Sequence, residues 1–117
     1  MDEASRARNE LLRRAHGVIV EYGWVQGGYG DLRTGFCVVG ALDEARREMR
    51  LRCRFDFDPE SIEEGFHSSY DALRDLVWLE GFWSAADVGV LSRWNDEPGR
   101  TRTEVLDLFS QAFVPGS

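Results

Sequence analysis

The stretch that decides the fold is residues 3–22, EASRARNELLRRAHGVIVEY. Its apolar residues recur at spacings of three and four, which is typical of the buried face of an amphipathic helix. They are Leu11, Leu12, Ala15, Val18, Ile19 and Tyr22. Gly23 follows directly, and glycine ends helices readily because it adopts a left-handed backbone conformation without steric penalty. We therefore predict a helix from Glu3 to Tyr22 that packs one face into a helical core.

Four later segments repeat this helical pattern. They are residues 37–50, 68–80, 84–94 and 101–114. The last three have start or stop signals. Ser68 with Asp71 approximates a capping box and Gly81 ends that segment, and Ser84 precedes Asp87 by three residues. Thr101 and Glu104 form a capping box, and Pro115 with Gly116 ends the last segment. A separate short helical turn is predicted at residues 59–64. Within residues 68–80, the pattern places Leu73, Leu76, Val77 and Leu79 or Glu80 on the buried side.

Residues 51–58, LRCRFDFD, alternate between apolar and charged side chains. Strict alternation is typical of a half-buried β-strand, which would pair with part of the glycine loop or run extended across the helices. The expected fold is therefore mainly α. We predict a compact bundle of about five helices in a single domain over residues 1–117, with a small β element near residues 51–57.

Composition excludes several classes of function. The 14 basic residues are all arginine, and 21 acidic residues give a net charge of −7, which disfavours nucleic-acid binding. No apolar run is long enough to span a membrane. The N-terminal residues are charged and lack the apolar region of a secretory signal, so we expect a cytoplasmic protein.

Metal and phosphate sites are not predicted either. Residues 23–36, GWVQGGYGDLRTGF, contain five glycines but lack the lysine of a phosphate-binding loop. His16, Cys37, Cys53 and His67 form no pair at zinc-binding spacing. We expect no cofactor, no metal, and two free thiols.

Cys37 is the one candidate nucleophile. It stands where the glycine-rich loop meets a predicted helix, and a helix N-terminus lowers the pKa of a thiol. Gln26 precedes it, and His67 and then Asn95 or Asp96 follow, which is the order of oxyanion donor, nucleophile, base and orienting residue in thiol hydrolases. A small thiol-dependent hydrolase or transferase using Cys37, His67 and Asn95 is thus one hypothesis. The other places Cys37 in the core as a small apolar residue, because its neighbours are apolar.

Three motifs carry a resemblance to a known family. They are G-W-x-Q-G at residues 23–27, C-x-x-G-A-L at residues 37–42 and W-N-D-x-x-G-R-T at residues 94–101. The chain resembles a family of small actinobacterial and phage proteins of unknown function, over its whole length except about residues 51–66. The resemblance implies no specific activity. It also implies no fixed histidine at the position of His67, which counts against a Cys–His enzyme.

The first and last motifs supply the candidate binding residues. They are Trp24, Gln26, Trp94, Asn95, Asp96 and Arg100. If the two loops meet, these residues either lock helix ends together or line a shared pocket for a small molecule or peptide. Our leading hypothesis is a non-catalytic binding or accessory module whose partner is a protein. The alternative partner is a small molecule that binds between the two loops.

Overall fold

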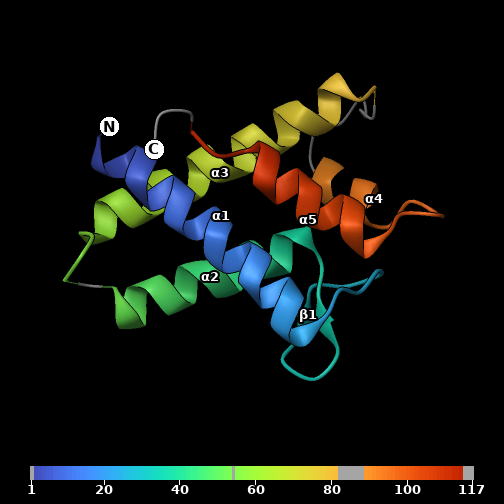
Figure 1. Ribbon diagram of the computed structural model, residues 1–117, viewed down its shortest axis with the longest axis horizontal. Coiled ribbons are helices and arrows are strands. Elements are labelled where there is room, and N and C mark those ends of the chain that lie inside the picture. The colour runs from blue at the N-terminus through green and yellow to red at the C-terminus, as the bar shows by residue number, and fades with distance from the viewer. Residues whose placement is uncertain (1, 54, 82–88, 115–117) are drawn as a thin grey trace.

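Helix α1 (Glu3–Tyr22) is the centre of the structure, a computed structural model that describes residues 2–53, 55–81 and 89–114. The other elements follow in chain order. They are β1 (Gly30–Asp31), β2 (Gly35–Phe36), α2 (Val38–Arg52), α3 (Pro59–Leu79), α4 (Val90–Asn95) and α5 (Arg102–Gln111). Figure 1 shows α1 crossing the middle of the molecule, in contact with α2, α3 and α5. The described residues form five helices, so the predicted mainly helical fold is confirmed.

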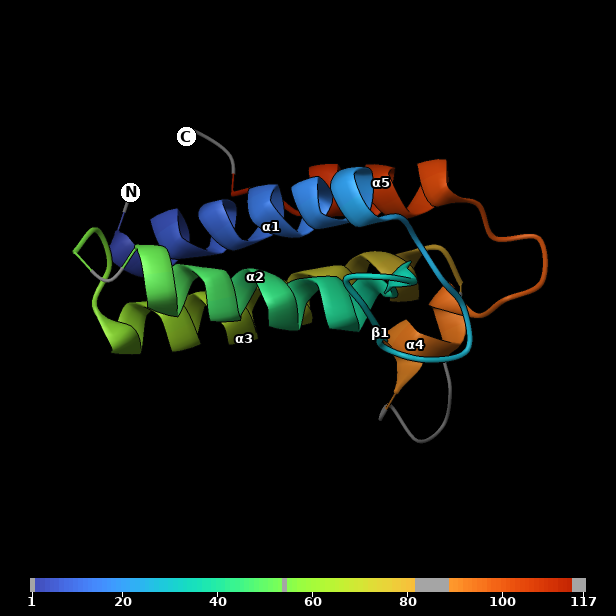
Figure 2. The ribbon, with the colours of Figure 1, turned by 90° about the horizontal axis from the view of Figure 1, so that it is seen from below.

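The helices form two layers. Figure 2 shows α1 and α5 in one layer and α2 and α3 in the other, with α4 and the short hairpin β1–β2 at one end. Helix α4 packs against both α2 and α3. The core lies between the layers, and its largest fully buried side chains include Trp94, Phe109, Leu11, Leu12 and Leu42.

The prediction for residues 3–22 is confirmed at both ends. Asp2 caps the helix, and its carboxylate accepts a hydrogen bond of 2.8 Å from the backbone N–H of Ser5. Gly23 ends the helix with a φ of 99°, a conformation that residues with a Cβ rarely adopt. Leu11 and Ile19 are fully buried, so the apolar face is the one that packs.

Helix α3 corrects the predicted division between residues 59–64 and 68–80. The two segments form one continuous helix that begins at Pro59, where Asp58 accepts a hydrogen bond of 2.8 Å from the N–H of Ser61. Gly65 lies in the interior of this helix and faces α1, where an added Cβ would stand 2.8 Å from the backbone nitrogen of Arg8. The glycine therefore permits close helix packing instead of breaking the helix.

The strand predicted at residues 51–57 is wrong. Helix α2 continues to Arg52, and the chain then turns, because the N–H of Phe57 donates to the carbonyl of Cys53 at 3.0 Å. Leu51 and Phe55, expected on the buried side, are 64% and 89% exposed. The β element lies instead in the glycine-rich loop, where β1 and β2 pair antiparallel.

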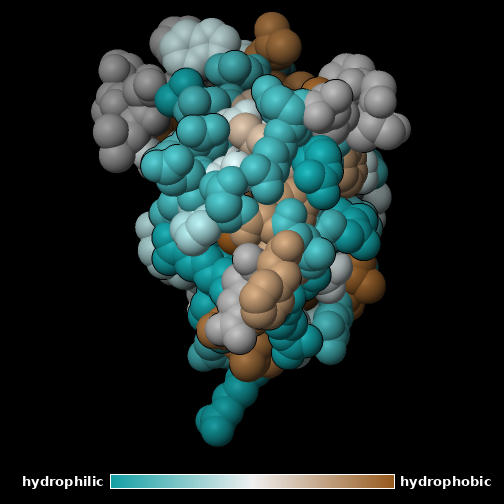
Figure 3. Space-filling view, turned by 90° about the vertical axis from the view of Figure 1, so that its left-hand side faces the viewer, coloured by the Kyte–Doolittle hydropathy of each residue, from teal (hydrophilic) through white to brown (hydrophobic). Residues whose placement is uncertain are grey.

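The last two helices are shorter than predicted. Gly89, inside the predicted helix at residues 84–94, has a left-handed backbone with a φ of 77°, so α4 begins only at Val90. Helix α5 ends at Gln111, three residues before the predicted end at residue 114. Helix α4 contains Trp94, whereas its predicted start at Ser84 and Asp87 lies outside the described residues, as do Pro115 and Gly116. Helix α5 begins with the predicted capping box of Thr101 and Glu104. None of the described helices is both long and apolar enough to cross a membrane. The face drawn in Figure 3 is mostly hydrophilic, with hydrophobic residues in small areas.

Candidate functional site

The first and last sequence motifs meet at the buried side chain of Asn95. Its Oδ1 accepts hydrogen bonds from the indole Nε1 of Trp24 at 2.7 Å and from the backbone N–H of Val38 at 3.1 Å. Its Nδ2 donates to the carbonyl of Val25 at 2.9 Å and to Oδ1 of Asp96 at 3.0 Å. One amide thus joins the glycine-rich loop, the start of α2 and the end of α4. We call this meeting point the Asn95 junction.

Two further contacts fasten the glycine-rich loop to the turn after α4. Nε2 of Gln26 donates to the carbonyls of Asn95 and Glu97, both at 3.0 Å. The backbone N–H of Gly27 donates to Oδ1 of Asp96 at 2.8 Å. The loop is therefore held along residues 24–27.

Arg100 holds the other side of the same turn. Its Nε donates to the carbonyl of Trp94 at 2.9 Å, and its Nη1 lies 2.9 Å from Oε2 of Glu104. Its guanidinium carbon stands 3.8 Å from the centroid of the Trp94 ring, a cation–π arrangement. Nε1 of Trp94 in turn donates to Oε2 of Glu80 at 3.1 Å. The guanidinium is thus engaged within the protein.

The structure therefore brings together all six candidate binding residues, and their polar groups bond to one another and to neighbouring groups of the same chain. A small cavity of about 200 Å³ remains beside them. It is lined by Gly27, Gly28, Tyr29, Cys37, Ser92 and Asp96. Of the six candidates, Asp96 alone lines this cavity.

Cys37 is buried at the start of α2, with 3% of its surface exposed. Its Sγ accepts a hydrogen bond of 3.3 Å from the N–H of Gly40. Burial raises the pKa of the Cys37 thiol, and the nearby charge of Asp96 raises it further, whereas the backbone N–H groups at the helix start lower it. Loss of hydration outweighs the effect of the helix terminus, so the thiol stays protonated at neutral pH.

The predicted set of Cys37, His67 and Asn95 is brought together only in part. Asn95 bonds to the residue after Cys37, but His67 is exposed on α3 and lines a different cavity. Both cysteines are free and buried. Among the described residues, no three histidine, cysteine, aspartate or glutamate side chains are arranged to hold a metal ion.

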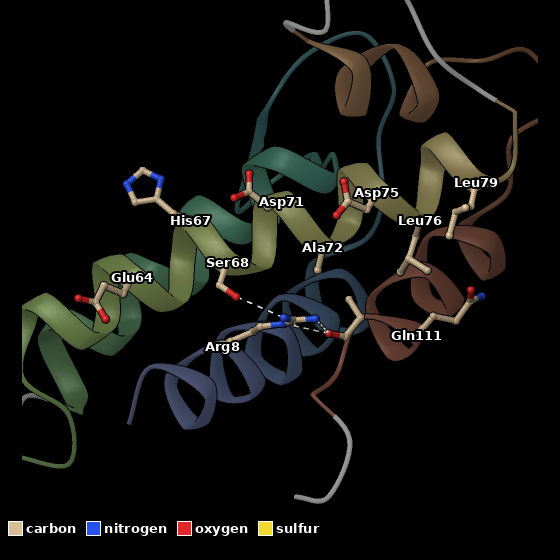
Figure 4. A pocket seen from close by; sticks show the side chains of 11 residues that line it. Arg8, Glu64, His67, Ser68, Asp71, Ala72, Asp75, Leu76, Leu79 and Gln111 are labelled. Carbon is tan, nitrogen blue, oxygen red and sulfur yellow. Dashed lines mark hydrogen bonds between the residues drawn. The ribbon is translucent and has the colours of Figure 1, made fainter. Parts of the chain in front are cut away.

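A larger cavity, of about 650 Å³, lies between α3 on one side and α1 and the end of α5 on the other (Figure 4). We call it the α3 groove. Its lining residues come from α1, α3, α5 and the residue after α5: Arg8, Glu64, His67, Ser68, Asp71, Ala72, Asp75, Leu76, Leu79, Gln111 and Ala112. Leu79 is 82% exposed, in contrast to the buried position considered for it from the sequence.

Arg8 lines the side of the α3 groove that lies opposite α3, and its guanidinium is held there by hydrogen bonds. Its Nη1 donates to Oγ of Ser68 at 3.2 Å, and its Nε donates to the carbonyl of Ala112 at 3.1 Å. Burial lowers the pKa of Arg8 from its ordinary value. Figure 4 shows the guanidinium reaching from α1 to the end of α5, so this arginine closes one side of the groove.

Sequence reasoning missed the α3 groove, although a signal was present. Ala72, Leu76 and Leu79 have the i, i+4, i+7 spacing of a helix stripe, and Asp71 and Asp75 flank it. The same spacing describes a core face. A second stripe, containing Leu73 and Val77, is the one that the structure buries.

Comparison with known proteins gives a family but no activity. A family model described as a family of unknown function, DUF6197, matches residues 4–113. No curated protein and no solved structure matches the chain. The match covers nearly the whole length, including the Asn95 junction and the α3 groove. The chain therefore belongs to this family of unknown function, DUF6197.

Proposed function

We propose that the protein is a non-catalytic module that binds a partner protein, and that the α3 groove is its binding surface. The observation that carries this proposal is an open cavity of about 650 Å³ beside a leucine, Leu79, that is 82% exposed. Concave surfaces that combine apolar side chains with a few polar groups are typical of binding sites.

In this proposal the motif residues position the loops and do not contact the partner. The polar groups of these residues form hydrogen bonds to other parts of the chain, as seen at Trp24, Gln26, Asn95 and Arg100. A residue that is satisfied internally gains little by exchanging those bonds for bonds to a ligand. The Asn95 junction then holds the end of α4 against the glycine-rich loop and the start of α2.

Thiol chemistry at Cys37 stays a prediction from the sequence, and two observations count against it. The thiol is 3% exposed with a raised pKa, and no histidine lines its cavity. A thiol nucleophile needs a thiolate and a base within reach. The cytoplasmic location and the actinobacterial or phage source also stay predictions from the sequence.

Site-specific photo-crosslinking tests the proposal with a matched pair of exposed leucines. A photoreactive phenylalanine analogue replaces Leu79 in the groove or Leu51 on α2, which is 64% exposed outside it. We expect a discrete adduct with one protein from position 79 and none from position 51. The captured protein, purified, should bind the wild-type chain and the Leu51→Asp variant but not the Leu79→Asp variant. Equal crosslinking from both positions, or none from position 79, would refute the proposal.

A further inference from the structure

We infer that the segment bound in the α3 groove is a basic amphipathic α-helix of the partner protein. This inference rests on the proposed function, because it names the chemistry of the partner at the same surface. Three features of the groove carry it: its length along α3, its apolar stripe and its acidic residues, of which Glu64 and Asp75 have no ion-pair partner in the described part of the chain.

The length of the groove fits a helix. Its lining on α3 runs from Glu64 to Leu79, which at 1.5 Å per residue is about 22 Å. The opposite side is formed by Arg8 of α1 and by Gln111 and Ala112 at the end of α5. A trough of this length between helices accommodates about four turns of a further helix laid along α3.

The apolar stripe supplies the contact area. Ala72 and Leu76 are partly buried against the core, and Leu79 is mostly exposed, so one edge of the stripe is open. The small side chain of Ala72 lets a helix approach closely in the middle of the groove. An occupant with apolar residues at spacings of three and four would cover this stripe.

The negative charge of the groove favours basic residues beside the apolar face of the partner helix. Glu64, Asp71 and Asp75 contribute three carboxylates. Arg74 lies 3.5 Å from Asp71 with much of both side chains exposed, an arrangement of small energetic value. Within the described part of the chain, neither Glu64 nor Asp75 has an ion-pair partner.

The single arginine of the groove does not neutralise these carboxylates. Arg8 donates instead to Ser68 and to the carbonyl of Ala112. A partner helix with arginine or lysine beside its apolar face would therefore meet Glu64 and Asp75, which no cation in the described part of the chain pairs. Nucleic acid, an anionic membrane and the acidic α3 of a second copy would each be repelled, and the net charge of −7 adds to that repulsion.

Peptide binding by the full chain tests the inference. The probes are fluorescent 15-residue helical peptides with one leucine face and either arginine or glutamine on the flanks, together with a scrambled arginine peptide. We expect the arginine peptide to bind at least tenfold more tightly than the glutamine peptide. The difference should shrink as salt is raised, since exposed charges are screened.

Variants locate the binding. Glu64→Gln and Asp75→Asn should each weaken the arginine peptide about threefold, within the range for exposed ion pairs. The matched control Glu97→Gln removes the same charge from an exposed position outside the groove and should leave the affinity unchanged. Thermal melting of each variant confirms that the fold is retained.

The outcomes separate the inference from the proposed function. If both peptides bind equally and Leu79→Asp abolishes binding, the groove binds protein but the basic partner is wrong. If no peptide binds and position 79 captures no protein, both proposals fail. Equal binding of the scrambled arginine peptide, binding of anionic vesicles or duplex DNA, or a concentration-dependent dimer lost in Leu79→Asp would each overturn the basic helix.

Discussion

Replacing Asn95 with alanine removes the side chain that joins three separate segments of the chain. Four hydrogen bonds disappear, and three groups lose the partner that the structure gives them. These are Nε1 of Trp24, the N–H of Val38 and the carbonyl of Val25. Oδ1 of Asp96 keeps its bond from Gly27.

The size of the effect follows from where those three groups lie. A buried group left without a partner costs about 1–3 kcal/mol. Val38 is fully buried, whereas Trp24 and Val25 are partly exposed, so water replaces part of what they lose. We therefore expect Asn95→Ala to lower the free energy of unfolding by about 3–4 kcal/mol. At about 4 °C per kcal/mol for a domain of this size, the Tm falls by about 12–16 °C.

Urea denaturation followed by far-ultraviolet circular dichroism measures this loss. Trp24→Phe is the matched control, because it removes one donor and leaves Oδ1 of Asn95 bonded to Val38. It should cost about 1 kcal/mol. A loss for Asn95→Ala below about 1 kcal/mol, or no greater than that of Trp24→Phe, would show that the junction does not stabilise the fold as argued.

Three further predictions test other parts of the structure. Gly65→Ala should destabilise the protein by about 1–2 kcal/mol, because the new Cβ would collide with the backbone of α1. Gly17→Ala, at a helical site with open space around it, should instead stabilise the protein by about 0.5–1 kcal/mol. Equal effects of the two substitutions in thermal melts would refute the close approach of α3 to α1. Because burial raises the pKa of Cys37, iodoacetamide at pH 7 should label this residue at least tenfold more slowly in the native protein than in the urea-unfolded protein. Mass spectrometry identifies the labelled cysteine. Fast labelling of the native protein below pH 7 would support the thiol hypothesis instead. The pKa of Glu104 is lowered, chiefly by the hydrogen bond from the backbone N–H of Thr101 at the start of α5. Its carboxylate therefore stabilises the fold at pH values above the ordinary pKa of glutamate, and this stabilisation is lost as the pH falls through the folded-state pKa. Glu104→Gln should melt at a lower temperature than wild type at pH 7, and a difference in Tm that persists at pH 2–3 would contradict this prediction.

The sequence predicted the helices better than the connections between them. Residues 3–22 carry a long helical pattern with a clear stop, so local and tertiary preferences agree. Residues 51–57 failed because Cys53 and Phe57, the two buried positions, are four apart, a spacing that fits a helical turn as well as a strand. Leu51 and Phe55, the other two apolar residues of the alternation, are exposed to solvent.

The candidate site was predicted in part for a similar reason. From the sequence we considered a meeting of the two motif loops, and the structure joins Trp24 to Asn95 and places Arg100 on the other side of the same turn. The hydrogen bonds among these residues could not be predicted, because they depend on how close distant segments lie in the folded chain, and a local sequence pattern does not specify that. The α3 groove was missed because Leu79 has the same helical spacing as a core residue, and exposure is decided by which helix packs where.

The Asn95 junction also has a consequence for synthesis on the ribosome. The amide that holds the N–H of Val38 stands 57 residues later in the chain. At about 5–20 residues per second, the loop at residues 24–38 waits roughly 3–11 s after its own synthesis before that amide exists. During this interval α1 and α2 can pair, but the indole of Trp24 and the start of α2 lack their partner. Nascent chains stalled before and after residue 95 should therefore differ in the protection of this loop from protease.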